Sequence, residues 1–299
     1  MNSNHIKVFA TGGSGQVGTE LVRRGQKWQT NIIAPNHSEI DITDFSRIHS
    51  TLKREMPDIV INSAAFTAVD AAESEQDLAF KVNRDSLEFM ASSCKKLSIP
   101  LIHLSTDYVF DGAKITAYEE KDPICPIGVY GRSKEAGECI VRNILNDHII
   151  LRTSWVYAAH GNNFVKTMLK IGKERDTLNI VNDQNGSPTF AGDIADAVLS
   201  IAKQVLCKYD NSSWGTYHYT AKGQTTWKGF AEKIFDRAQS YLSGSPVING
   251  IPSSDYPTPA KRPLNSVLNC NKIDLKFAPP RRKWQEGLTE VLDELLQGS

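Results

Sequence analysis

The 299-residue sequence lacks several features, and each absence excludes a class of protein. It carries no net charge, since 34 Lys and Arg residues balance 34 Asp and Glu residues, so no global field favours nucleic acid or an anionic membrane. Its five cysteines are scattered and form no C-x-x-C pair, which argues against a disulfide framework or structural zinc. No apolar run approaches the roughly 20 residues of a membrane span, and no charged-then-apolar leader follows Met1. We therefore expect a soluble cytoplasmic protein with no nucleic-acid or membrane partner, and neither Mg²⁺ nor another metal has support in the sequence.

Apolar, β-branched segments alternate with helix-like stretches through the first half of the chain. This alternation indicates right-handed βαβ units, and hence an α/β fold with a doubly wound parallel sheet of the Rossmann type. We predict that residues 1–153 form this domain and that 154–299 form a smaller C-terminal α/β portion interleaved with it. The predicted strands are 6–10, 31–34, 58–62, 101–105 and 149–152, and the predicted helices are 16–28, 44–56, 76–97 and 130–146.

The second half has a different pattern, rich in turn residues such as those of 182–188. Prolines at 252, 257, 259 and 263 predict a long ordered loop or an extended crossing over 249–263 rather than a helix. Further helices are predicted at 163–174, 191–206, 226–242 and 284–297.

A glycine-rich segment, T-G-G-S-G-Q-V-G at 11–18, follows the first predicted strand and opens the first helix. Gly12, Gly15 and Gly18 allow a tight turn and close approach of the backbone to a pyrophosphate, which the free N–H groups of the helix then stabilise. This context predicts a dinucleotide site. The alternative is a glycine-rich turn that binds nothing.

The end of the second strand, Ala34-Pro35-Asn36, holds neither the acid that favours NAD nor an arginine that favours NADP. The choice between NADH and NADPH is therefore open. Asp41 and Ile42 are expected near the adenine, although Asp41 also suits the start of a helix. Small residues after the third strand, Ala64 among them, allow a cofactor to approach, or serve helix packing.

Ser105-Thr106-Asp107 ends the fourth strand, where ligands bind in such sheets, and Tyr130 and Lys134 follow at helical spacing. A lysine beside a tyrosine favours the phenolate, so we expect Lys134 to lower the pKa of Tyr130. Hydroxyl residues at strand ends are also common turn formers, and Y-x-x-x-K occurs by chance in many helices. The glycine-rich segment, the hydroxyl residues after the fourth strand and the Tyr130/Lys134 pair together indicate a carbonyl reductase.

These three features, in this order along the chain, resemble the extended short-chain dehydrogenase/reductases. Longer phrases resemble the dTDP-4-dehydrorhamnose reductase family over essentially the full chain. These phrases are N-S-A-A-F-T-A-V-D-A-A-E at 62–73, S-T-D-Y-V-F at 105–110, Y-G-R-S-K-E-A-G-E at 130–138, R-T-S-W-V-Y at 152–157, G-N-N-F-V-K-T-M-L at 161–169, V-N-D-Q-N-G-S-P-T at 181–189 and Y-P-T-P-A-K-R-P-L-N-S-V-L-N at 256–269. The resemblance implies reduction of dTDP-4-dehydro-L-rhamnose to dTDP-L-rhamnose with NADPH or NADH, for surface polysaccharides.

The resemblance also assigns roles to matching residues. Tyr130 would donate a proton to the C4 oxygen, Lys134 would hold the nicotinamide ribose, and Thr106 would bond the reacting oxygen. Asp107 and Trp155 would position the sugar together with Thr106 and Tyr130, although Trp155 alone also suits a core aromatic. The cofactor residues implied are Gly12, Gly15, Gln16, Val17, Gly18, Asp41, Ile42, Ala64, Ala65, Phe66, Thr67, Leu104, Tyr130 and Lys134, with Asn83 behind the site.

Two departures from the family pattern concern the cofactor pocket. Asn36 replaces an acid near the adenosine ribose, and Phe66 stands where relatives often carry histidine. The alternatives to this function are another nucleotide-sugar reductase or epimerase, and a non-catalytic subunit like the regulatory beta subunit of methionine adenosyltransferase. A dTDP-sugar is the expected substrate partner, and a homodimer is an expected assembly.

Overall fold

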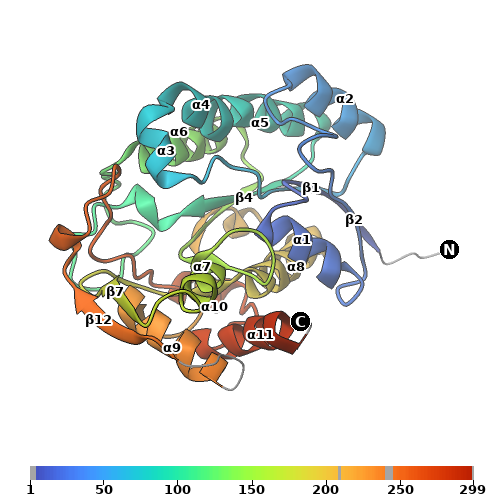
Figure 1. The fold of residues 1–299 in the computed structure, drawn as a ribbon. Helices are drawn as coiled ribbons and strands as arrows, with labels where there is room; N and C mark the ends of the chain where they lie inside the picture. The colour runs from blue at the N-terminus through green and yellow to red at the C-terminus, as the bar shows by residue number, and fades with distance from the viewer. Residues whose placement is uncertain (1–4, 208–209, 240–244, 298–299) are drawn as a thin grey trace.

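The computed structural model describes residues 5–207, 210–239 and 245–297. A six-stranded parallel sheet in the order β10-β5-β4-β3-β1-β2 forms its centre (Figure 1). The strand order reverses between β1 and β3, which is where ligands bind in doubly wound sheets, and the predicted fold class is confirmed. The strands are β1 (Ile6–Thr11), β2 (Thr30–Ile33), β3 (Ile59–Asn62), β4 (Leu101–Thr106), β5 (His148–Thr153) and β10 (Gly215–His218).

Helices cover both faces of the sheet because successive strand residues point to opposite sides. Val8 and Ala10 pack with residues of α1 and α8, whereas Phe9 packs with residues of α2 and α5 on the other face. Figure 1 shows these two helical layers above and below the sheet. Their helices are α1 (Gln16–Gly25), α8 (Ala191–Cys207) and α11 (Trp284–Gln297) on one side, and α2 (Phe45–Glu55), α5 (Ser86–Leu97) and α6 (Val129–Ile144) on the other.

All five predicted strands are confirmed to within one residue at each end, and the predicted helix 76–97 is confirmed in its bounds but contains a π-helical turn. It consists of α4 (Gln76–Phe80), the π-helical turn (Lys81–Asp85) and α5 without interruption, and a separate short helix, α3 (Val69–Ser74), precedes it. The Asn83 side chain accounts for the π-helical turn, because its amide bonds both the N–H and the carbonyl of Phe66, at 2.8 and 3.0 Å, and also the Ser133 hydroxyl. Helical spacing in the sequence does not reveal such tertiary bonds.

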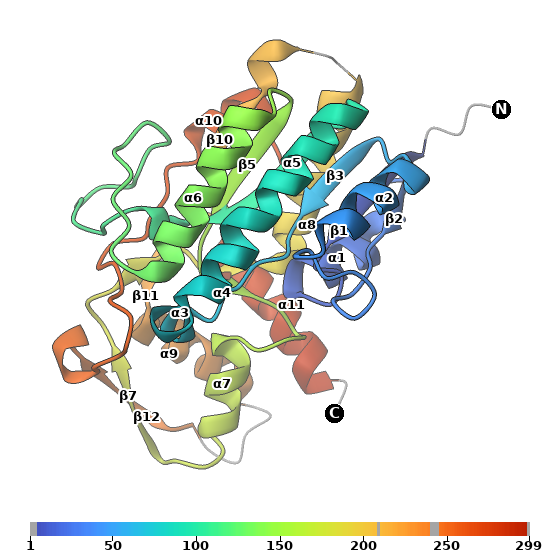
Figure 2. The ribbon, with the colours of Figure 1, turned by 90° about the horizontal axis from the view of Figure 1, so that it is seen from above.

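The C-terminal portion lies beside the carboxyl edge of the sheet (Figure 2). A parallel pair, β7 (Thr177–Val181) and β12 (Val247–Ile251), packs against α9 (Trp227–Ala238), which also contacts α7 (Phe164–Ile171). The extended crossing predicted at 249–263 is confirmed apart from one short 3-10 turn, Ser253–Asp255, and the predicted helix end at 242 lies outside the described residues. The short elements are β6 (Val156–Tyr157), β8 (Asn185–Gly186), β9 (Thr189–Phe190), β11 (Thr225–Thr226) and α10 (Asn271–Lys276).

The two portions are joined through the main sheet, because β10 of the C-terminal half pairs with β5. The division at residue 153 stays a prediction. Within the described ranges, no helix has the length and apolar character that a bilayer span needs.

Candidate active site

The glycine loop lies between β1 and α1, at the carboxyl end of the sheet. Gly12 has a φ of +75°, and a Cβ on Gly18 would lie 2.0 Å from the Gly12 carbonyl oxygen, so neither position accepts a side chain. Gly15 caps α1 without a side-chain bond, and the first turn of α1 has no acidic residue. The first N–H groups of this helix therefore suit an anion such as pyrophosphate, and the cradle fits a dinucleotide.

The next two residues tie this cradle to the C-terminal portion. The Gln16 side-chain oxygen accepts a hydrogen bond from Asn163 at 3.0 Å, and the Gln16 carbonyl lies 3.0 Å from Nε2 of His160. Val17 is buried against the sheet. A ligand on the N-terminus of α1 would thus lie beside both portions.

The segment after β3 is fixed from behind by Asn83, which holds both backbone polar groups of Phe66. Ala64 donates its N–H to the Asn62 side chain at 3.2 Å, while Thr67 is exposed. This rigid backbone borders the glycine loop, since a Cβ on Gly12 would lie 2.8 Å from the Ala64 nitrogen. The predicted cofactor residues of both loops therefore lie side by side.

The loop after β2 contains an acid, Glu39, that was not predicted from the sequence. Asn36 accepts hydrogen bonds from Ser38 and Glu39 through its side chain, and its own N–H donates to the Glu39 carboxylate at 2.8 Å. Asp41 accepts the N–H of Thr43 at 2.8 Å and so shapes the turn before α2, whose cap is Asp44. Ile42 is buried in the core on that side. The adenine-side role of Asp41 and Ile42 stays a prediction.

Thr106 and Asp107 end β4 in a buried position. The Thr106 hydroxyl donates to Oδ1 of Asp107 at 3.0 Å and accepts the N–H of Tyr108. Burial raises the pKa of Asp107 to about 6, against the hydrogen bonds of Ser266 and Thr106. Oδ2 of Asp107 is buried and has no hydrogen-bond partner among the described residues, so one acceptor at this strand end is left unsatisfied.

Tyr130 and Lys134 lie in the first half of α6, facing this strand end. Burial raises the pKa of Tyr130 to about 12, the Thr106 hydroxyl offsets part of the rise, and Asp107 adds to it. The prediction that Lys134 lowers the pKa of Tyr130 is therefore wrong for the ligand-free protein. Burial also lowers the pKa of Lys134 to about 8, although Glu138 opposes this. The phenol therefore keeps its proton at neutral pH and has one to donate.

A buried histidine behind Lys134 was not predicted. Nζ of Lys134 donates to the Leu104 carbonyl at 2.8 Å and lies 3.4 Å from Nε2 of His103. Asn62 directs its amide nitrogen to Nδ1 of His103 at 3.0 Å, because its amide oxygen accepts the N–H of Ala64. Nδ1 must then accept, so the neutral ring carries its proton on Nε2, toward Lys134. Burial disfavours the Lys134 ammonium, and the Nε2 proton of His103 offers it no acceptor.

Trp155 has a strained backbone, with φ of +48°, and its ring stacks on Trp227 with centroids 3.6 Å apart. A Cβ on Gly186 would lie 2.3 Å from the Trp155 ring, so both sides of the ring are close to protein. The contacts with Trp227 and Gly186 keep Trp155 in this strained backbone conformation, as is common near functional sites. Its predicted contact with the sugar stays a prediction, since Trp227 rather than Trp155 lines the cavity described next.

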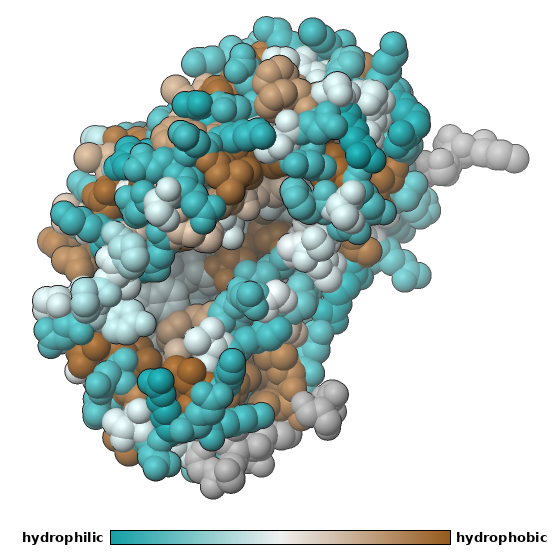
Figure 3. Space-filling model, turned by 45° about the horizontal axis from the view of Figure 1, so that its top comes forward, coloured by the Kyte–Doolittle hydropathy of each residue, from teal (hydrophilic) through white to brown (hydrophobic). Residues whose placement is uncertain are grey.

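A cavity of about 1070 Å³ lies between α7, the β7/β12 pair and the 253–262 segment, and Ile127, three residues before Tyr130, forms part of its wall. Figure 3 shows the molecule hollowed between its two portions. The cavity offers cations and aromatic rings, none of which the sequence identified as site residues. These are Arg175, Lys261, Arg262, Phe164, Trp227 and Tyr256.

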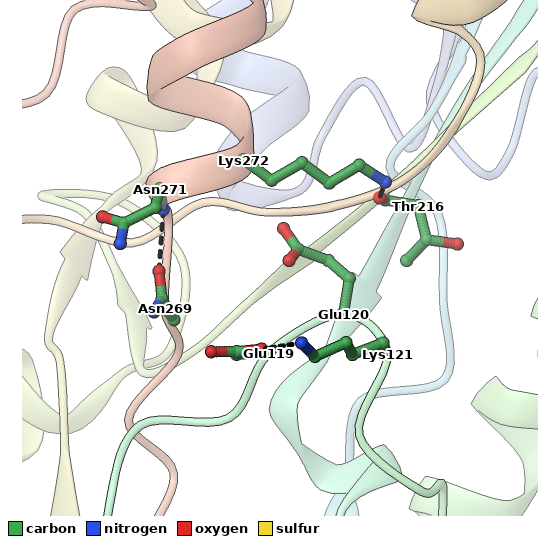
Figure 4. Close-up of a pocket in the computed structure, with 7 residues that line it drawn as sticks. All are labelled: Glu119, Glu120, Lys121, Thr216, Asn269, Asn271 and Lys272. Atoms are coloured by element: carbon green, nitrogen blue, oxygen red, sulfur yellow. Dashed lines mark hydrogen bonds and ion pairs between the residues drawn. The ribbon is translucent and has the colours of Figure 1, made fainter.

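A second cavity, of about 590 Å³, lies beside β10 and α10 (Figure 4). Its charged groups already have protein partners, since Lys121 pairs with Glu119 at 3.1 Å and Lys272 donates to the Thr216 carbonyl. No predicted site residue is among the residues that line it, so we assign it no role in the reaction.

The doubly wound sheet, the glycine cradle, and Thr106, Tyr130 and Lys134 on neighbouring elements define a dinucleotide-dependent reductase of the extended short-chain type. Comparison with known proteins makes the assignment specific: the model of the family described as RmlD substrate binding domain matches residues 6–297, and the chain belongs to that family.

Two relatives are dTDP-4-dehydrorhamnose reductases that match this chain over nearly its whole length. The protein from Escherichia coli K12 is 41% identical over 97% of this chain and 98% of its own. The protein from Aggregatibacter actinomycetemcomitans is 40% identical over 95% and 98%. The crystal structure of a dTDP-4-dehydrorhamnose reductase from Bacillus anthracis, in complex with NADP, is 34% identical, with a TM-score of 0.88 over 97% of this chain and 99% of that one.

Proposed function

We propose that this protein reduces the C4 ketone of dTDP-4-dehydro-L-rhamnose to dTDP-L-rhamnose with NADPH or NADH, in the synthesis of surface polysaccharide. The observation that carries the proposal is the meeting of Tyr130, Thr106 and Asp107 at the end of β4, between a dinucleotide cradle and a cavity with cations and aromatic rings. The near-full-length relatives named above support this substrate.

The cradle of Gly12, Gly15 and Gly18 would hold the dinucleotide, whose reduced nicotinamide would supply a hydride to the C4 carbon when bound. Tyr130 gives its phenolic proton to the C4 oxygen, so the ketone becomes an alcohol and the resulting phenolate later recovers a proton from solvent. The raised pKa of Tyr130, about 12, ensures that the proton is present at neutral pH. The Thr106 hydroxyl, which donates to Asp107 in the free protein, would turn to donate to the same C4 oxygen and polarise it.

The cavity supplies the remaining contacts for a nucleotide-linked sugar. Arg175 and Lys261 offer positive charge to a diphosphate, and Trp227 and Tyr256 offer ring faces to a pyrimidine. The free oxygen of Asp107 would accept a hydrogen bond from a sugar hydroxyl. Cations and rings in one cavity favour a nucleoside diphosphate sugar over a simple ketone.

The test is oxidation of NADPH and NADH in the presence of dTDP-4-dehydro-L-rhamnose. Tyr130→Phe should lower kcat by on the order of 10²-fold, because it removes the proton donor, and should still bind NADPH. Tyr108→Phe is the matched control, since its ring lies 5.5 Å from that of Tyr130, and it should retain most activity. No turnover by the wild type would refute the function, and equal turnover by Tyr130→Phe would refute the proton donor.

The competing substrates are other nucleotide sugars, and the competing class is a non-catalytic subunit. Retention of Thr106, Tyr130 and Lys134 together favours an enzyme. The same assay with UDP-linked 4-ketosugars distinguishes the substrates. A cytoplasmic location and a homodimer are further proposals, which fractionation and light scattering of the purified protein would test.

A further inference from the structure

The short helix α3 carries two carboxylates, Asp70 and Glu73, one helical turn apart. They belong to the N-S-A-A-F-T-A-V-D-A-A-E segment and contact two separate parts of the site. Neither is a group of the proposed reaction. Both lie where α3 packs against Val129, Tyr130 and Tyr108 in one small apolar cluster.

Asp70 holds one wall of the large cavity. Arg262 donates from both terminal nitrogens to the two Asp70 oxygens, at 2.9 and 2.6 Å, and Ala260 donates its N–H to Oδ1 at 3.1 Å. Arg262 also donates to the Ala260 carbonyl at 2.8 Å. This bidentate, charge-assisted arrangement fixes a cavity wall to a residue 192 positions earlier in the chain.

Glu73 caps the helix that carries Tyr130. Its Oε1 accepts the N–H of Val129, the first residue of α6, at 2.7 Å. The cap residue of α6 is Gly128, which has no side chain to do this, and a Cβ there would lie 2.9 Å from Oε1 of Glu73. Gly128 therefore makes room for a cap supplied by α3.

We propose that α3 is a clasp that couples the cavity wall to Tyr130, with Asp70 and Glu73 as positioning residues. Asp70 keeps Ala260 and Arg262 in place for the sugar nucleotide. Glu73 keeps the start of α6, and with it the phenol of Tyr130, in place for proton transfer. Because one short helix makes both contacts, release of the cavity wall loosens the start of α6.

Amide hydrogen exchange on the ligand-free protein tests the coupling without reliance on the proposed function. Glu73→Ala should speed exchange at Val129 by about fivefold, the effect of losing one helix cap, and Glu73→Gln should restore protection because its amide oxygen still accepts. Asp70→Asn should speed exchange at Ala260 and also at Val129. A variant Asp70→Asn that affects Ala260 alone would overturn the coupling.

Glu75→Gln is the matched control, since it removes an exposed acid at the end of α3 for which no side-chain hydrogen bond or ion pair is found among the described residues. It should leave both amides unchanged, and a change equal to that of Asp70→Asn would overturn the proposal by attributing the effect to charge alone.

Kinetics provide a second readout, which rests on the proposed function. Asp70→Asn should raise KM for the dTDP-sugar by about tenfold, and because it also loosens the start of α6 it should lower kcat by about twofold, less than the direct loss of the cap does. Glu73→Ala should lower kcat by about fivefold, with KM kept. Equal effects of both variants on kcat and KM would indicate a merely structural α3 and overturn the assignment. Absence of turnover in the wild type would refute the function, while the exchange experiment would still decide the clasp.

Discussion

Tyr130 and Lys134 are both buried, and burial moves their pKa values in opposite directions. Each shift favours the neutral side chain, because a charge without water is costly. The Glu138 carboxylate, one turn after Lys134, opposes the shift, but it is itself paired with Arg152 and Arg142. The free protein therefore holds a protonated phenol beside a lysine that loses its proton near pH 8.

Burial of Lys134 lowers the free energy of unfolding of the protein. Its pKa falls from 10.5 to about 8 on folding, so the cost is fully present below pH 8 and fades as the pH rises to 10.5. Such a shift corresponds to on the order of 3 kcal/mol, of which the bond to Leu104 offsets about 1 kcal/mol. Lys134→Met should therefore raise the free energy of unfolding at pH 7 by about 2 kcal/mol while abolishing reduction.

Urea unfolding at several pH values measures this effect. The advantage of Lys134→Met should shrink between pH 8 and 10, and Lys95→Met, at an exposed position on α5, should change little at any pH. A variant Lys134→Met that is less stable than the wild type at pH 7 would show that the lysine stabilises the fold.

The residue types at the reaction centre could be predicted from spacing, but their protonation could not. Y-x-x-x-K after S-T-D indicates which groups meet, since helix and strand geometry are local. The pKa of Tyr130 depends on burial, which is a property of the whole fold, and the prediction that Lys134 lowers it was wrong. His103 was missed for the same reason, because its partners Asn62 and Lys134 lie on other elements.

At the scale of elements, strands were predictable because apolar, β-branched runs are a local signal. The π-helical turn within 76–97 was not, since Asn83 turns inward to bonds with Phe66 and Ser133, which are distant in sequence. Arg175 carried no signal, and Arg262 lies in the quoted phrase at 256–269 without any sign of the residue that it contacts. The contacts of Arg262 and Ala260 with Asp70 show why the phrases at 62–73 and 256–269 belong together.

The first element that a substitution can test is α1 with its glycine loop. A Cβ on Gly18 would lie 2.0 Å from the Gly12 carbonyl oxygen, so Gly18→Ala must move α1 away from the loop. Overpacking of this kind costs about 1–3 kcal/mol. The dissociation constant of NADPH, measured by fluorescence titration, should rise by about tenfold or more.

Gly25→Ala, at the other end of α1, is the matched control, because its nearest neighbour is the flexible end of Ile32 at 2.9 Å. It should bind NADPH as the wild type does. Wild-type affinity in Gly18→Ala would contradict the assignment of this loop to the cofactor.

At the scale of the whole molecule, ion pairs join the two portions. Arg24 of α1 contacts Glu20 of its own helix at 3.0 Å, Asp196 of α8 at 2.8 Å and Glu290 of α11 at 2.7 Å. Asp196 also accepts the ring N–H of Trp28. Since β10 completes the main sheet as well, we expect the portions to unfold as one unit rather than as two domains divided at residue 153.

Differential scanning calorimetry tests this expectation. The wild type should show one transition, with calorimetric and van't Hoff enthalpies that agree. Arg24→Met leaves Glu20 and Asp196, which are 2% and 8% exposed, with fewer partners, and should lower the free energy of unfolding by about 2–3 kcal/mol. Arg47→Met, at an exposed position on α2, should have little effect. Because Arg24 connects three helices of one cooperative structure, the variant should still unfold in one step at a lower temperature; a separate early transition would instead establish two domains.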